Sequence, residues 1–116
     1  ADIPNAVRET GIQPEVRELG LDTLADTRAA VDDLAATVGG SIAVITPSRY
    51  ADRLAPLDGA HDGRVIVIDP LSTKGLEYDA TVVVDPDAIT DEAPGGVRVL
   101  YVVLTRAAHR MTVLRT

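Results

Sequence analysis

The sequence SIAVIT, Ser41–Thr46, is a continuous apolar run, and two runs of the same kind follow it. These are RVIVI, Arg64–Ile68, and ATVVVD, Ala80–Asp85. Unbroken runs of Val, Ile and Ala are typical of strands that are covered on both faces, as in parallel sheets. Between the first two runs, Pro47 is well placed to begin a helix that we expect from about Ser48 to Leu57. This part of the chain therefore predicts three buried strands and a connecting helix.

The alternation of strands and helices extends toward the amino terminus. The segment EVREL, Glu15–Leu19, predicts a short, half-exposed strand, and Asp22 is a candidate cap for a helix from Thr23 to about Val38. Apolar residues recur in that helix at intervals of three and four, and Gly39-Gly40 is expected to end it. Residues 1–14 contain two prolines and a glycine, so we expect an extended lead-in there.

The carboxy-terminal part shows the same alternation. Residues 69–79 and 86–96 are expected to be loops, and the second of them is acidic. Val97–Ala108 predicts a helix, and RMTVL, Arg110–Leu114, predicts a final strand. Because strands alternate with helices, we predict one α/β domain over residues 1–116, with a mainly parallel sheet between two layers of helices. Ligands bind such sheets at the carboxyl ends of strands, and the 69–79 loop follows a strand.

Composition limits the classes of function. Hydrophobic residues make up 46% of the 116 residues, which is enough for one packed domain. The net charge of −7 predicts weak binding to nucleic acid by this chain alone, because such binding depends largely on neutralising phosphates. The absence of cysteine excludes disulfides and thiolate metal sites, and the two histidines are too far apart in sequence to indicate a metal centre.

The sequence also bears on location. No apolar run approaches the roughly 20 residues of a membrane span, and the first residues lack the pattern of a signal peptide. We therefore expect a cytoplasmic protein without membrane contact. The chain begins with ADIPNAVRETG and has no initiator Met, so we expect a fragment of a longer protein.

Lys74-Gly75-Leu76-Glu77 is the first candidate site. Gly75 would allow a tight turn or a close approach of the backbone to a ligand. Glu77 could accept hydrogen bonds from a sugar hydroxyl, as acidic residues do in dinucleotide-binding folds. The same four residues also fit a solvated loop, in which a Lys–Glu pair has little energetic value.

Arg106 is the second candidate, at the end of the apolar stretch LYVVLTRA, Leu100–Ala107. As a cation near a helix C-terminus it would contribute roughly 0.3–1 kcal/mol through the helix dipole. As a planar guanidinium it is also suited to phosphate. Thr105 fits either a surface position or a hydrogen-bonding position in the same site. The phosphate-binding pattern G-x-x-x-x-G-K-[ST] is absent, so we expect no nucleotide hydrolysis by this chain unaided.

Two segments, STKGLEYDATVVV (Ser72–Val84) and LYVVLTRAAHRMTVL (Leu100–Leu114), together resemble known helicase motifs. They are similar to the fifth and sixth motifs of UvrD/Rep/PcrA-like superfamily-one DNA helicases, which read roughly S-x-K-G-L-E-[FY]-D-x-V and L-x-Y-V-A-x-T-R-A. The resemblance implies a three-layer RecA-like domain of the P-loop NTPase type. It would be the second such domain of an ATP-dependent DNA helicase.

The resemblance also implies roles for particular residues. Arg106 would be catalytic, reaching the γ-phosphate of ATP bound on an N-terminal RecA-like domain of the same parent chain. Glu77 would contact the ribose, and Gly75 would permit close backbone approach. The contacts to single-stranded DNA would come from Ser72, Thr73 and Lys74. The implied cofactor of the full-length protein is ATP with Mg²⁺, with the metal held mainly by the missing domain.

The chain departs from the helicase pattern at a few positions. Asp69 and Leu71 stand where the family often has Thr and a polar or basic residue, which weakens the inference of a single-strand contact. Val103 replaces a usual alanine, which changes only packing. The arginine of the fourth motif would fall before Ala1, which again suggests a fragment.

The segment VRETGIQPEVREL, residues 7–19, resembles HelD-like ATPases of actinobacteria, which bind RNA polymerase. The resemblance implies RNA polymerase as a further partner, and the acidic charge suits a protein-binding role. The alternative function is a degenerate, non-enzymatic RecA-like module that binds RNA polymerase or a repair protein. A flavodoxin-like or receiver-like domain would share the layered architecture, but would not account for KGLE together with LTRA.

Overall fold

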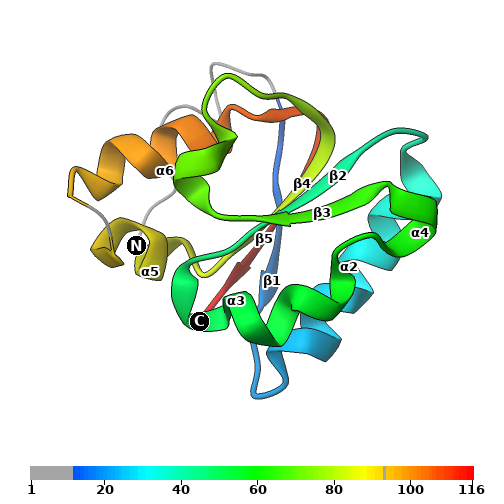
Figure 1. Ribbon diagram of the computed structural model, residues 1–116, viewed down its shortest axis with the longest axis horizontal. Helices are drawn as coiled ribbons and strands as arrows, with labels where there is room; N and C mark the ends of the chain where they lie inside the picture. The colour runs from blue at the N-terminus through cyan, green and yellow to red at the C-terminus, as the bar shows by residue number, and fades with distance from the viewer. Residues whose placement is uncertain (1–11, 93) are drawn as a thin grey trace.

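The computed structural model describes residues 12–92 and 94–116 (Figure 1). Over these residues, five strands form one sheet in the order β1-β5-β4-β2-β3, and each neighbouring pair is parallel. The strands are β1 (Glu15–Glu18), β2 (Ile42–Ile45), β3 (Val65–Ile68), β4 (Tyr78–Val84) and β5 (Ala107–Arg115). The helices are α2 (Thr23–Thr37), α3 (Ser48–Leu54), α4 (Ala60–Gly63), α5 (Pro86–Glu92) and α6 (Gly96–Leu104), with 3-10 turns η1 (Ala55–Leu57) and η2 (Pro70–Thr73).

Helices cover both faces of the sheet, with α2 and α3 on one side and α5 and α6 on the other (Figure 1). The central strand β4 has a core on each face, which explains the apolar run Val82–Val84. Val82 and Val84 lie in the core formed with Leu34 of α2, whereas Val83 lies in the core formed with Leu104 of α6. Side chains of a strand point alternately to opposite faces, so a strand with a core on each side needs apolar residues at every position.

The predicted α/β architecture is therefore confirmed, and the described sheet is parallel throughout. Of the expected lead-in, residues 12–14 belong to no strand or helix, and residues 1–11 lie outside the described part of the chain. Within the ranges given above, no helix has both the length and the apolar character needed to cross a membrane.

The prediction of a loop over residues 86–96 was wrong, because Pro86–Glu92 forms α5. Asp85 begins this helix: its Oδ1 accepts a hydrogen bond from the backbone N–H of Ala88 at 3.3 Å. Pro86 at the first helical position also favours a helix start, since its fixed φ suits a helix and an N–H at that position would have no partner within the helix.

The predicted helix over Val97–Ala108 was too long. α6 ends at Leu104, and β5 begins at Ala107 rather than at Arg110. The backbone N–H of Tyr78 donates to the carbonyl of Arg106 at 2.9 Å, and Ala107 pairs with Tyr78 in the sheet. Pairing with β4 thus takes these residues out of the helix, and Arg106 lies between α6 and β5.

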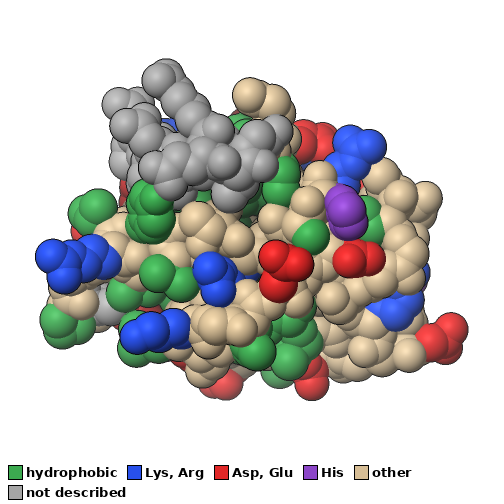
Figure 2. Space-filling view, turned by 90° about the horizontal axis from the view of Figure 1, so that it is seen from above, with side chains coloured by type: hydrophobic (Ala, Val, Ile, Leu, Met, Phe, Trp, Pro, Cys, Tyr) green, Lys and Arg blue, Asp and Glu red, His purple; other side chains and the backbone are tan. Residues whose placement is uncertain are grey.

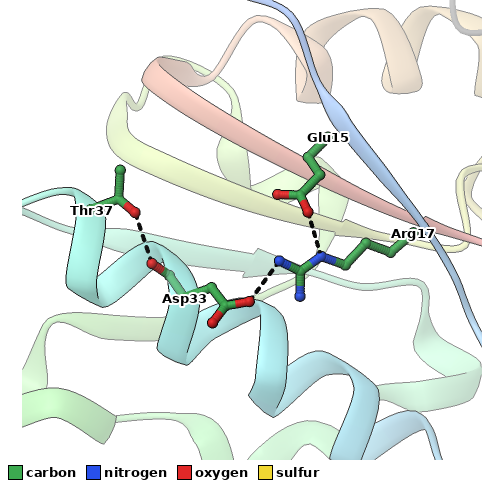
Figure 3. Close-up of polar contacts among 4 residues, drawn as sticks. All are labelled: Glu15, Arg17, Asp33 and Thr37. Atoms are coloured by element: carbon green, nitrogen blue, oxygen red, sulfur yellow. Dashed lines mark hydrogen bonds and ion pairs between the residues drawn. The ribbon is translucent and has the colours of Figure 1, made fainter.

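Arg17 ties the edge strand β1 to α2 (Figure 3). Its Nε donates to Glu15 at 2.9 Å, and its Nη2 donates to Asp33 of α2 at 2.7 Å. These two carboxylates raise the pKa of Arg17 above its usual value. Half-exposed pairs of this kind contribute about 1 kcal/mol or less, but charged side chains on an edge strand also discourage pairing with another chain.

Gly96 sets the distance between α5 and α6. A Cβ built on Gly96 would lie 1.8 Å from the carbonyl oxygen of Thr90 in α5. Backbone atoms cannot yield as a flexible side chain can, so a residue larger than glycine would force the two helices apart. Gly96 therefore fixes the start of the helix that leads to Arg106.

We predict that Gly96→Ala lowers the free energy of unfolding by about 1–3 kcal/mol, because overpacking forces backbone shifts. Gly39→Ala is the matched control: a Cβ there meets nothing within 4 Å. The control should change stability by less than about 0.5 kcal/mol. Urea unfolding of both variants measures the difference, and equal stabilities would contradict the close packing of α5 and α6.

Candidate functional site

The connection from β3 to β4 carries one of the two helicase-like motifs. It leaves the carboxyl edge of the sheet after Ile68, passes η2 beside α6, and enters β4 at the amino edge. Asp69 begins η2, because its Oδ1 accepts from the N–H of Ser72 at 3.0 Å and its Oδ2 accepts from the Ser72 hydroxyl at 2.6 Å. The acid that departs from the helicase pattern is thus the cap of this turn.

The candidate residues lie at the amino ends of β4 and β5, and not at the carboxyl edge where ligands were expected. The carboxyl edge does have a hollow of ≈ 430 Å³ beside the ends of β2 and β3. Asp58 and Asp69 line it, together with Thr46, Ser48 and small apolar residues. Neither Arg106 nor the segment Lys74–Glu77 lines this hollow, and its carboxylates are unsuited to phosphate.

Arg106 joins the two motifs through its side chain. Its Nε donates to the carbonyl of Val102 at 3.1 Å, and its Nη1 donates to the carbonyl of Leu76 at 3.1 Å. Its Nη2 donates to the hydroxyl of Thr105 at 2.9 Å. Together with the bond between Tyr78 N–H and the Arg106 carbonyl, these contacts hold the KGLE loop against the end of α6.

The Arg106 guanidinium retains unused donors. A guanidinium has five N–H groups, and each of its three nitrogens uses one of them here. One N–H on each Nη is left, and the side chain is half-exposed. Over residues 12–92 and 94–116, Arg106 forms no ion pair with a carboxylate. The group is therefore a fixed cation with two donors available to an anion.

The other residues of the KGLE loop are presented to solvent. Lys74, Gly75 and Glu77 are all exposed. Gly75 has φ +81°, and a Cβ built on it meets nothing within 4 Å. Glycine is thus required by the backbone conformation and not by crowding. The space beside the Gly75 backbone is thus free of described protein atoms.

Ser72 and Thr73 have internal roles in this conformation. Thr73 is fully buried, and its hydroxyl donates to the carbonyl of Pro70 at 2.8 Å. Ser72 is exposed, but its hydroxyl donates to Asp69. Of the three residues expected to contact DNA, only Lys74 presents a side chain that has no such internal bond in the described structure.

Figure 2 looks onto the upper end of the molecule in Figure 1, where the chain enters β4 and β5. Several Lys and Arg side chains are seen on the part of this face toward α6, beside hydrophobic side chains. Asp and Glu side chains lie mainly toward the middle and the opposite side. Despite the net charge of −7, this part of the surface is not uniformly acidic.

A buried polar pair at the carboxyl edge was not predicted. The Tyr50 hydroxyl of α3 donates to Asp85 at 2.8 Å, and Asp85 has φ +50°. Burial and this hydrogen bond raise the pKa of Tyr50. The sequence Asp85-Pro86 carried a signal, because an acid before proline is typical of a helix start. The pair joins the two helix layers where β2 and β4 end.

Among the described residues, no three or more His, Asp or Glu side chains are grouped to hold a metal ion.

The chain is an α/β domain with a five-stranded parallel sheet and helices on both faces. Neither a protein-family model nor a curated protein matches the sequence. Among solved structures, the C-terminal domain of a possible DNA helicase from Lactobacillus plantarum WCFS1 has a similar fold. The match has a TM-score of 0.64 and 19% sequence identity, and it covers 89% of this chain and 73% of that one. At this identity the match establishes the fold.

We predict that Tyr50→Phe lowers stability at about pH 7 by about 1–3 kcal/mol, since it removes the donor to Oδ2 of buried Asp85 and leaves only the Ala88 N–H bonded to Oδ1. The pKa of Tyr50 is raised above its usual value of 10.0, so the folded state favours the neutral phenol. The contribution of the neutral Tyr50 phenol to the free energy of unfolding is complete below pH 10.0, and it is lost as the pH rises through the folded-state pKa. Tyr50→Phe should therefore lose less stability than the wild type on further alkalinisation.

Tyr78→Phe is the comparison, because burial alone raises the pKa of Tyr78. Tyr78→Phe should also reduce the loss of stability at alkaline pH. It should change the stability at about pH 7 less than Tyr50→Phe does, because no carboxylate loses a donor. Urea unfolding from about pH 7 to about pH 11 tests both variants. Equal losses for the two variants near neutral pH would contradict the Tyr50–Asp85 contact.

Proposed function

We propose that this chain is the C-terminal RecA-like domain of an ATP-dependent DNA helicase. Arg106 would act on ATP bound by an N-terminal RecA-like domain of the same parent protein. The observation that carries the proposal is the state of Arg106. Its guanidinium is fixed by neutral acceptors from both motifs, has no carboxylate partner within the described residues, and retains two N–H donors.

The chemistry of a guanidinium fits this role. Its planar donors match phosphate oxygens, and it stays charged at any physiological pH. An arginine supplied to a phosphoryl group in this way stabilises charge in the transition state and raises the rate by about 10³–10⁵. A cation already paired with a carboxylate would have much less charge to offer.

The exposed part of the KGLE loop would bind the sugar. Glu77 lies one residue before β4, and Leu76, next to it, holds Arg106 through its carbonyl. Glu77 would accept hydrogen bonds from the ribose, while Gly75 leaves open space for it. One loop would thus contact the nucleoside and orient the residue that acts on the phosphates. Mg²⁺ would be held mainly by the other domain.

We predict that Arg106→Ala in the full-length parent protein lowers kcat for ATP by about 10³-fold or more. Arg106→Lys should restore little of it, because an ammonium cannot reproduce the planar fork. The control is Arg98→Ala, since Arg98 is exposed on α6 and lies outside the site. Steady-state ATPase assays measure the effect, and wild-type turnover by Arg106→Ala would overturn the proposal. The 116-residue chain alone should show no ATPase activity.

A second candidate is a non-enzymatic module that binds RNA polymerase or a repair protein. The net charge of −7 favours a protein partner over nucleic acid. Within the motor hypothesis, the HelD-like segment would likewise suit remodelling of RNA polymerase complexes. Contact with single-stranded DNA would then rest mainly on Lys74, with Ser72 and Thr73 shaping its loop.

Binding experiments with the full-length protein separate these partners. We expect capture of RNA polymerase at moderate salt, and weak binding to single-stranded DNA that falls steeply as salt is raised. Lys74→Ala should weaken the DNA binding and leave capture of RNA polymerase unchanged. Tight DNA binding without capture of the polymerase would contradict the HelD-like assignment. A parent protein without a phosphate-binding loop would favour the non-enzymatic module.

A further inference from the structure

Thr105 occupies the junction between α6 and Arg106. It is the C-terminal cap of α6, and its hydroxyl donates to the carbonyl of Val102 at 2.7 Å. The same hydroxyl oxygen accepts the hydrogen bond from Arg106 Nη2. The Val102 carbonyl also accepts from Arg106 Nε, so the three residues form a closed ring of hydrogen bonds.

The ring fixes the direction of each bond in it. A guanidinium has only donors, so the Thr105 oxygen must act as the acceptor toward Arg106. The hydroxyl proton is then free to be donated to the Val102 carbonyl oxygen, which lies 2.7 Å from the Thr105 oxygen. With Nε and Nη2 both held from the α6 side, the guanidinium plane cannot rotate about its Nε–Cζ bond without breaking the ring.

A third contact holds the group from the other side. Leu76 of the KGLE loop accepts from Nη1, so all three nitrogens of Arg106 are restrained. The two unused N–H groups, one on each Nη, are thereby given a fixed direction. Catalysis by a positioned charge depends on such prior orientation, and small displacements lower the rate strongly.

We propose that Thr105 is a positioning residue, whose hydroxyl locks the guanidinium of Arg106 in the plane that presents its free N–H groups to a nucleotide phosphate. This inference rests on the proposed function, because it assumes that Arg106 acts on ATP. A simpler role for Thr105 would be that of a helix cap, since Thr hydroxyls often bond to a carbonyl of the preceding turn. A cap would affect stability but not the orientation of Arg106.

The first test uses the full-length protein and three substitutions of Thr105. Thr105→Val keeps the shape but removes the acceptor, and we expect kcat for ATP to fall about tenfold with KM changed less than about twofold. Thr105→Ala should behave like Thr105→Val, and Thr105→Ser should restore kcat because it keeps the hydroxyl. The matched control is Thr90→Val. The Thr90 hydroxyl donates to the carbonyl of Pro86 at 3.1 Å, which is the same kind of bond, and Arg106 takes no part in it.

A second test needs no catalysis and uses the 116-residue chain. Nuclear magnetic resonance of the ¹⁵N-labelled arginine side chains reports rotation about Nε–Cζ and exchange of guanidinium protons with water. Thr105→Val should accelerate both for Arg106, whereas Thr105→Ser and Thr90→Val should not. A lower melting temperature for Thr105→Val with unchanged Arg106 signals would make Thr105 a helix cap and overturn the inference.

The two assays separate failure of the inference from failure of the proposed function. If Arg106→Ala retains turnover, the proposed function is wrong whatever Thr105 does. If Arg106→Ala abolishes turnover while Thr105→Val has wild-type kcat, only the positioning role is wrong. A loss of kcat in Thr105→Val that serine restores, together with faster Arg106 side-chain rotation, supports both.

Discussion

The parallel pairing of β4 with β5 is the constraint on which the candidate site depends. Parallel strands begin at the same edge of a sheet, so the segments that lead into neighbouring strands must lie side by side. Tyr78 and Ala107 pair at the starts of β4 and β5. Leu76, two positions before Tyr78, and Arg106, directly before Ala107, are consequently brought within hydrogen-bonding distance although they are 30 positions apart in sequence.

The same pairing explains which parts of the fold could be predicted from the sequence. The apolar runs identified β2 and β4, because a strand between two cores has no solvent-facing position to mark with polar residues. The same signal identified β3, although β3 is an edge strand and its Ile66 is exposed. The end of α6 could not be predicted, because Ala107 and Ala108 are favourable in a helix. Ala107 and Ala108 belong to β5 because they lie beside β4, which is distant in sequence. The helix or strand preference of the residues themselves cannot reveal that pairing.

The sequence indicated candidate residues for a site, but it could not indicate the hydrogen bonds that join them. Arg106, Glu77 and Gly75 were chosen as candidates from their residue types, and their roles in a site stay predictions. The carbonyl groups of Leu76 and Val102 leave no mark in the sequence, since every residue has one. The role of Thr105 depends on those carbonyl groups, so sequence could place Thr105 near the site but could not choose between a surface position and a bonded one.

Three arginines of this chain show how the surroundings of a guanidinium decide what it can do. Arg17 is bonded to two carboxylates, which satisfy its charge. Arg64 donates to the carbonyl groups of Ala35, Val38 and Gly40 and so caps the end of α2. The carbonyl groups of Ala35 and Val38, at the end of α2, carry the negative end of the helix dipole, so the charge of Arg64 is also opposed.

Arg106 differs from Arg17 in that no carboxylate opposes its charge, and it shares with Arg64 a hydrogen bond to a carbonyl group in the last turn of a helix. Its three acceptors are neutral, so they hold the group in place without a full opposing charge. Within the described residues of a chain with a net charge of −7, carboxylates are plentiful, yet Arg106 pairs with none of them. A surface cation kept rigid but unpaired gains little stability for the fold. Its two remaining N–H groups leave it able to bind an anion from outside the chain, as the proposed role in nucleotide chemistry requires.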